Sequence, residues 1–101
     1  MSQTNEKQKR SPELYEALLT LKTVDECMLF FDDLCTQKEI HALEQRFQVA
    51  SMLHEGKIYN AILEKTGASS AIISRVNRSM QIGGEGYGIA FSRLEKESDP
   101  E

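Results

Sequence analysis

The sequence predicts an all-α protein, and three observations support that prediction. Residue patterns that begin and end helices recur along the chain. Apolar residues repeat at spacings of three and four, as on one face of a helix. Strict alternation of apolar and polar residues, which indicates strands, is absent. We therefore expect a single helical domain over residues 11–94, between an N-terminal tail (1–10) and a C-terminal tail (95–101).

Length and composition restrict the class of protein further. A chain of 101 residues forms one domain at most and buries a limited core, so we expect a second copy to add stability. The sequence has neither eighteen consecutive apolar residues nor a signal-peptide core, so we expect no membrane partner. Cys27 and Cys35 have no nearby CxxC or HxxxH companion, which predicts buried, reduced thiols in a cytoplasmic protein, without a metal.

The first helices can be placed from their starting residues. Residues 1–10 are polar and include three basic side chains, so we expect a solvated, disordered tail; a basic arm that touches DNA is the alternative. Ser11-Pro12-Glu13 is typical of a helix start, and three leucines follow on one face: Leu14, Leu18 and Leu21. Thr23 and Glu26 form the pattern of a capping box, which predicts a second helix through Leu34.

A second capping box, Thr36 with Glu39, opens the longest predicted helix. Gly56 is placed to end it. The helix carries an apolar stripe at spacings of three and four, made of Ile40, Leu43, Phe47, Ala50 and Leu53. His41 and His54 are too far apart for a shared site, so each is interpreted as a lone surface histidine.

Residues 57–80 have the pattern of a helix-turn-helix. Gly67 suits the left-handed backbone past a helix end, and Ser69 or Ser70 suits the N-cap of the next helix. The two helices are expected over about 59–66 and 70–80. The apolar residues expected to meet between and beneath them are Ile62, Leu63, Ala68, Ile73 and Val76. The outward face is expected to carry Ser70, Ala71, Ser74, Asn77 and Arg78.

The outward side chains fit contacts with DNA. Serine and asparagine can reach base edges, alanine can touch a thymine methyl, and arginine can bind phosphate or guanine. The total charge is −4, yet residues 57–80 hold four basic residues and one acidic residue, a net charge of +3. Residues 11–56 hold three basic and nine acidic residues. Because phosphate responds to the local charge, the patch outweighs the total.

The segment after Met80 is rich in glycine. Residues 81–88 do not fit the dinucleotide pattern GxGxxG, because Ile89 stands where the last glycine belongs, so we expect a mobile linker. Ile89, Phe91 and Leu94 then predict a short final helix whose apolar face needs a docking partner.

The helix-turn-helix also carries a resemblance to a known family. The segment TGASSAIISRVNRSM, preceded by ALEQRFQVASMLHEGK, resembles the Trp repressor family, and within it the YerC/YecD-type branch of Gram-positive bacteria. The resemblance spans roughly residues 14–91. It implies an intertwined homodimer whose two helix-turn-helix units, about one DNA turn apart, bind a double-stranded operator. The DNA-contacting residues would then be Lys57, Lys65, Ser69, Ser70, Ala71, Ser74, Asn77 and Arg78.

The resemblance also implies a small-molecule corepressor. Four positions match the family's effector-binding residues: Thr36, Arg46, Arg75 and Ser79. Val76, however, stands where the family has glycine, and Cys35 replaces a leucine. Valine adds bulk where an indole ring would enter. These departures favour a different small effector, or none, over tryptophan. For Arg46, a salt bridge with Glu39, Glu44 or Glu55 is the alternative.

Two functions follow from these observations. The first is a sequence-specific transcriptional regulator, a repressor by family, that binds DNA through its helix-turn-helix. The second is a helix-turn-helix that docks on an acidic protein surface without specific DNA binding. An enzyme is not predicted, because the sequence lacks a nucleophile–base pair, a metal cluster and a phosphate loop.

Overall fold

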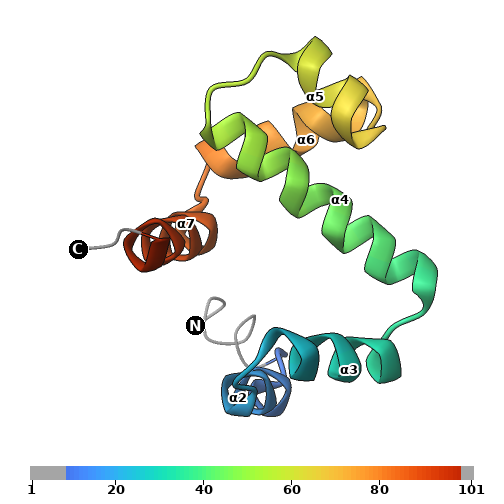
Figure 1. Cartoon of the computed structure of the whole chain (residues 1–101), viewed down its shortest axis with the longest axis vertical. Coiled ribbons are helices and arrows are strands. Elements are labelled where there is room, and N and C mark those ends of the chain that lie inside the picture. Colours follow the sequence, from blue (N-terminus) through green and yellow to red (C-terminus); the bar gives the residue numbers. More distant parts are fainter. Residues whose placement is uncertain (1–8, 99–101) are drawn as a thin grey trace. The chain divides into compact units, whose positions relative to one another are not determined.

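The computed structural model describes residues 9–98, which form six α-helices and no strand (Figure 1). The all-α class is therefore confirmed. The predicted arm or tail at residues 1–8 lies outside the described residues. The helices are α2 (Pro12–Thr20), α3 (Val24–Leu34), α4 (Gln37–His54), α5 (Tyr59–Thr66), α6 (Ser70–Gln81) and α7 (Glu85–Ser98).

The chain divides into two compact units, Met1–Ile40 and His41–Glu101. Helix α4 begins in the first unit and continues into the second.

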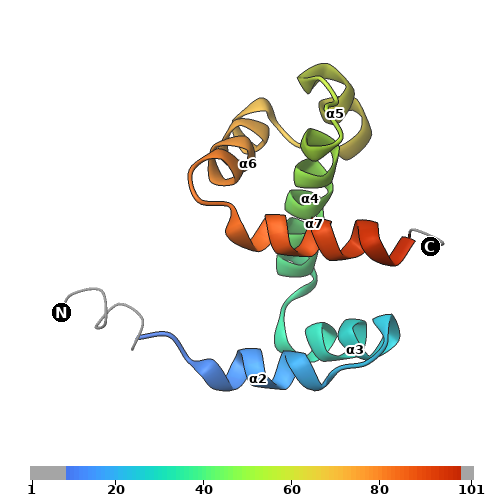
Figure 2. The same ribbon diagram turned by 90° about the vertical axis from the view of Figure 1, so that its left-hand side faces the viewer.

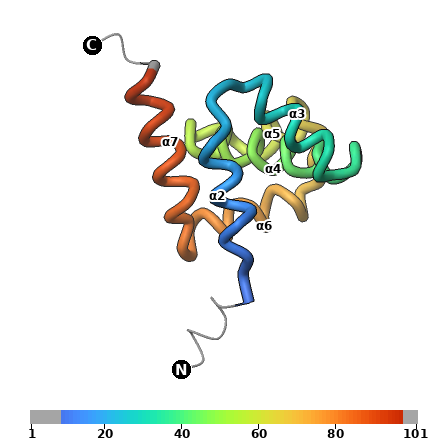
Figure 3. Tube along the Cα trace, turned by 90° about the horizontal axis from the view of Figure 1, so that it is seen from below, coloured from blue at the N-terminus to red at the C-terminus, as the bar shows by residue number. Residues whose placement is uncertain are grey.

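The helix starts of the first unit follow the predicted caps with small differences. Ser11 occupies the N-cap of α2, but its hydroxyl donates to the Glu13 carboxylate (2.7 Å) instead of capping the backbone. Thr23 Oγ1 accepts from the Glu26 backbone N–H at 3.0 Å. The Glu26 carboxylate accepts from the N–H of Lys22, one residue before the position that a capping box predicts. The turn between α2 and α3 can be followed in Figure 3.

The apolar side chains of this unit stay accessible to solvent. Neither α2 nor α3 contains a buried residue. Leu19 is 86% exposed and Leu29 is 66% exposed. Both cysteines are free and only half-buried, so the expectation that they are buried is wrong. The unit therefore carries much apolar surface that its own fold leaves uncovered.

Helix α4 has the predicted cap at each end. Thr36 and Glu39 exchange the two hydrogen bonds of a capping box, at 2.9 and 3.1 Å. At the other end Gly56 takes a φ of 86°, and the N–H groups of Gly56 and Lys57 donate to the carbonyls of Leu53 and Met52. This pair of bonds is a Schellman motif, which requires the left-handed residue that glycine supplies.

The buried face of α4 differs from the predicted stripe. Val49, which lies outside that stripe, is fully buried beside Ala50. Leu43 and Phe47 belong to the stripe but remain more than two-fifths exposed. Contacts with other helices, rather than spacing alone, decide which apolar side chains of α4 are covered.

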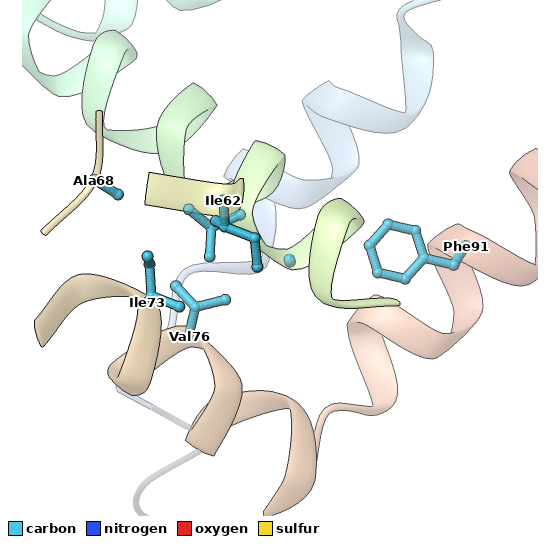
Figure 4. Packing of buried hydrophobic residues seen from close by; sticks show 7 residues of the cluster. Ile62, Ala68, Ile73, Val76 and Phe91 are labelled. Carbon is cyan, nitrogen blue, oxygen red and sulfur yellow. The ribbon is translucent and has the colours of Figure 1, made fainter. Parts of the chain in front are cut away.

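The second unit has one apolar core, built by α4, α5, α6 and α7 around the turn at Ala68. Ile62, Ile73 and Val76 point toward one another in this core (Figure 4). Phe91 enters it from α7. Four of the five residues predicted to meet around the helix-turn-helix are buried; Leu63 is 44% exposed, and its predicted burial is wrong. The helix pair is thus held on α4 by side chains from both of its members.

Helix α7 corrects two sequence-based expectations. It begins at Glu85, inside the segment predicted to be a mobile linker, and it ends at Ser98, inside the predicted tail. Helix α7 crosses α4 in Figure 2, and Phe91 stacks on Tyr87 and His54, with Phe47 also in contact. Docking of these rings offsets the low helix propensity of Gly86 and Gly88.

His54 also differs from the prediction of a lone surface histidine. Its Nε2 lies 2.8 Å from the Glu95 carboxylate, and its ring stacks on Phe91 at a centroid distance of 4.6 Å. The histidine therefore joins the end of α4 to α7.

Candidate nucleic-acid interface

The turn between α5 and α6 is built as the sequence predicts. Gly67 takes a φ of 73°, and its N–H donates to the Leu63 carbonyl at 2.9 Å. Ser69 is the N-cap of α6, since its hydroxyl accepts from the Ile72 N–H at 3.2 Å. The ends of both helices agree with the predicted ranges to within one residue. The left-handed glycine lets the chain reverse without the steric cost of a Cβ atom.

Helix α6 has one buried face and one exposed face. Ile73 and Val76 are buried on the inner face, and Met80 packs on the same core. At about 100° per residue, the centre of the opposite face falls near Ala71 and Arg78. The exposed residues of α6 are Ser70, Ala71, Ser74, Arg75, Arg78, Ser79 and Gln81. Small polar side chains, an alanine and two arginines therefore share the accessible surface of this helix.

Asn77 does not lie on that exposed face. It is half-buried; its Nδ2 donates to the hydroxyl of Tyr59 at 3.3 Å, and its Oδ1 accepts from Gln81 at 3.4 Å. The expectation that Asn77 faces outward is therefore corrected. The physical reason is that residue 77 falls beside Ile73 on the helical wheel, close to the first turn of α5. Its amide links the two helices of the pair.

The two lysines predicted to contact DNA are exposed. Lys57 is the last residue of the Schellman motif at the end of α4, and Lys65 lies in the last turn of α5. Ser69 is exposed as well, although its hydroxyl already caps α6. A DNA role for these residues stays a prediction.

The four predicted effector residues have different surroundings. The Thr36 hydroxyl accepts from the Glu39 N–H within the capping box. Arg46, Arg75 and Ser79 are exposed, and within residues 9–98 Arg46 forms none of the ion pairs considered as its alternative. Val76 is 3% exposed and packs in the core, on the inner face of α6. The side chain that replaces the family's glycine thus fills space inside the protein.

Gln45 and Thr66 were not predicted from the sequence to matter for this site. Gln45 on α4 donates a hydrogen bond to the backbone carbonyl of Thr66 at 3.1 Å. The two residues are 21 positions apart, so no local pattern could reveal the contact. Thr66 alone gives a weak signal, because a threonine late in a helix often bonds the carbonyl four residues earlier.

Comparison with known proteins agrees with this geometry. The family model for the Trp repressor protein matches residues 9–95. The chain belongs to the Trp repressor family. This match covers most of the chain, including both helices of the helix-turn-helix and most of α7. The family resemblance proposed from the residues is thereby confirmed.

Individual members of the Trp repressor family give the same result. The chain is 47% identical over 93 residues to the uncharacterised protein YerC of Bacillus subtilis (strain 168), covering 92% of this chain and 88% of YerC. A TrpR-like protein from Eubacterium eligens ATCC 27750 is 54% identical, with a TM-score of 0.79 over 82% of this chain and 86% of that one. A Trp repressor candidate from Staphylococcus aureus is 46% identical, with a TM-score of 0.82 over 88% and 92%. This protein is therefore of the YerC type.

The Trp repressor family is a family of regulatory proteins and not of enzymes. Membership in it is consistent with the sequence-based prediction, which did not include an enzyme. Within residues 9–98, histidine, cysteine and acidic side chains nowhere gather in groups of three that could hold a metal ion. In the same range, each helix is too short or too polar to cross a lipid bilayer.

Proposed function

We propose that this protein is a dimeric, sequence-specific DNA-binding transcriptional regulator that acts as a repressor. The observation that supports this best is the two-sided character of α6. Its inner face is buried on the core, and its outer face presents side chains suited to base edges and phosphates. Because its inner face stays packed on the core, α6 can enter a major groove while the rest of the domain keeps its fold.

The placement of charge also supports DNA as the partner. The helix-turn-helix carries a net charge of +3, whereas residues 11–56 are strongly acidic. Two copies would present +6 to one duplex. That charge attracts phosphate, while the acidic segment disfavours contact with DNA through the rest of the molecule.

The second copy is supported by the first unit. Helices α2 and α3 bury none of their residues within the chain. Large apolar side chains left accessible on several helices are typical of a surface that another molecule covers. Membership of the Trp repressor family supports an intertwined homodimer as that assembly.

An effector different from tryptophan, or none, is also part of the proposal. Val76 is buried with Ile62 and Ile73, so a ring that entered there would have to displace it. Displacing well-packed core atoms costs free energy. Calorimetry with tryptophan tests this point directly. We expect no saturable heat, and saturation at one ligand per chain would contradict the proposal.

Selection of bound sequences from random duplex DNA tests the function as a whole. We expect enrichment of a near-palindromic site with two half-sites spaced by about 34–36 Å, one helical turn. The selection is run with and without candidate amino acids to expose an effector. Retention of DNA without enrichment at physiological salt would contradict sequence-specific binding. Loss of all DNA under those conditions would favour the alternative of a protein-interaction module.

A further inference from the structure

The hydrogen bond between Gln45 and Thr66 joins two parts of the second unit that are distant in sequence. Thr66 is the last residue of α5, and its carbonyl is one of those that a helix leaves without an internal partner. Gln45 Nε2, from α4, donates to this carbonyl at 3.1 Å in a partly buried environment. The side chain of one helix thus completes the end of another.

The same residue holds the turn through its side chain. The Thr66 hydroxyl donates to the Ile62 carbonyl at 2.8 Å and accepts from the Ala68 N–H at 3.1 Å. Ala68 is itself buried, and Ser69 directly after it caps α6. The Thr66 carbonyl therefore accepts from α4, and the Thr66 hydroxyl ties the end of α5 to Ala68 in the turn.

We propose that Gln45 is a positioning residue that sets where the N-terminus of α6 lies relative to α4. The apolar core holds α6 through Ile73 and Val76, in the middle of the helix. Apolar contacts are non-directional, so they resist separation better than they fix the start of a helix. The directional bond from Gln45 acts on the last residue of α5, four residues before α6 begins at Ser70.

The consequence for DNA binding rests on the function proposed above. Contacts to base edges need side chains held within a few tenths of an ångström, because hydrogen bonds lose strength quickly with poor geometry. Contacts to phosphate tolerate more displacement, since they depend on charge. Losing the Gln45 bond should therefore reduce discrimination between sequences more than it reduces general affinity.

Gln45→Met tests this inference, with Gln48→Met as the matched control. Methionine keeps length and helix propensity but removes the donor. Gln48 is exposed on the same helix, so the control makes the same chemical change away from the turn. The probes are the duplex that the unmodified protein selects and a scrambled duplex of equal length. Binding is measured where circular dichroism shows every variant fully folded.

For Gln45→Met we expect the ratio of selected to scrambled affinity to fall about tenfold, roughly the discrimination that one well-placed base contact contributes. For Gln48→Met the ratio should be unchanged. Equal ratios for the two methionine variants would overturn the inference.

Amide hydrogen exchange separates this inference from the proposed function. The Ala68 N–H should exchange faster in Gln45→Met than in Gln48→Met, with or without DNA. If the unmodified protein selects no duplex, the proposed function fails, and the exchange rates alone decide whether Gln45 holds the turn. Equal rates in the two variants would overturn that role too.

Discussion

Arg75 and Arg78 lie three residues apart on the exposed side of α6, where a helix brings such positions close together. A guanidinium can contact either phosphate or guanine, and the two roles differ in what they do to specificity. Phosphate contacts change affinity for all sequences, whereas base contacts change it for one. Each role therefore has its own experimental signature.

Arg78→Ala should weaken binding to selected and scrambled duplexes alike, if Arg78 contacts one phosphate. The logarithmic salt dependence of binding should become flatter by about one unit, because one fewer counterion is released. Arg93→Ala on α7 removes the same charge from an exposed site outside the helix-turn-helix. Fluorescence anisotropy over a salt series measures both. A slope that stays constant in Arg78→Ala would reject the phosphate contact.

Asn77 is the residue whose surroundings depart most from its predicted role. Because its amide bonds Tyr59, Asn77→Ala and Tyr59→Phe should each lower the free energy of unfolding by about 0.5–1 kcal/mol. The double variant should cost less than the sum of the two, since both remove the same bond. Urea unfolding of the four proteins measures this coupling. Strict additivity would argue against the link between α5 and α6.

At the scale of elements, the glycines before α7 and the glycines within it have opposite effects on the stability of this helix. Gly83 and Gly84 take φ values of 92° and 74° ahead of the helix, where L side chains are rarely tolerated. Gly88 lies inside α7, and a Cβ added there would meet no neighbouring atom. The first pair allows the sharp bend into α7, whereas Gly88 only weakens the helix that follows.

Substitution with alanine should separate these two kinds of glycine. Gly88→Ala should raise the free energy of unfolding by about 1 kcal/mol, the difference in helix propensity. Gly84→Ala should lower it, because the new Cβ would collide with the Met80 carbonyl and the left-handed backbone would be strained. Thermal or urea unfolding of the two variants provides the measurement. Stabilisation by Gly84→Ala would contradict the described bend.

Phe91 is the contact that docks α7. Phe91→Ala should cost about 3–5 kcal/mol, because a buried ring is removed from its contacts with Phe47 and His54. Ile89→Ala, on the same helix but half exposed, should cost much less. Glu95→Gln should cost at most about 1 kcal/mol, since the pair with His54 is solvent-accessible. Similar losses for Phe91→Ala and Ile89→Ala would mean that Phe91 does not anchor α7.

At the scale of the whole molecule, the uneven burial of apolar side chains between the two units predicts association of the chain with a second copy. Every fully buried residue among those described belongs to the second unit, whereas the first unit exposes Leu19, Leu29 and Leu34. A protein with such a surface gains stability by association, since apolar area removed from water is favourable. We therefore expect the oligomeric state to depend on α2 and α3.

Leu29→Glu tests this dependence. In a monomer, a leucine that is two-thirds exposed should tolerate glutamate with little effect. In the proposed dimer, the charge would be buried at the interface and should lower the sedimentation coefficient to that of a monomer. Lys38→Glu introduces the same residue at an exposed polar position of the first unit and should leave the dimer intact. Sedimentation velocity at micromolar concentration distinguishes the two outcomes.

Local sequence patterns predicted much of this architecture. The helix caps bond within one turn of their own helix, so spacing along the chain was enough to place them. These caps are Thr36 with Glu39, Gly56, Gly67 and Ser69. The start of α7 was missed, because glycine propensity opposes the helix and the favourable term comes from Phe91 docking on α4. For the candidate site, the exposed residues of α6 were found from periodicity, with Asn77 as the exception.

The sequence by itself determined the helix class, the turn and the family, because each depends on near neighbours or on a contiguous motif. The tertiary structure decided which side chains are covered, that Asn77 bonds Tyr59, and that Gln45 completes the end of α5. The physical reason is the separation along the chain between the residues that interact. Caps and turns are satisfied within a few residues, whereas burial and the Gln45 bond need partners that only folding brings together.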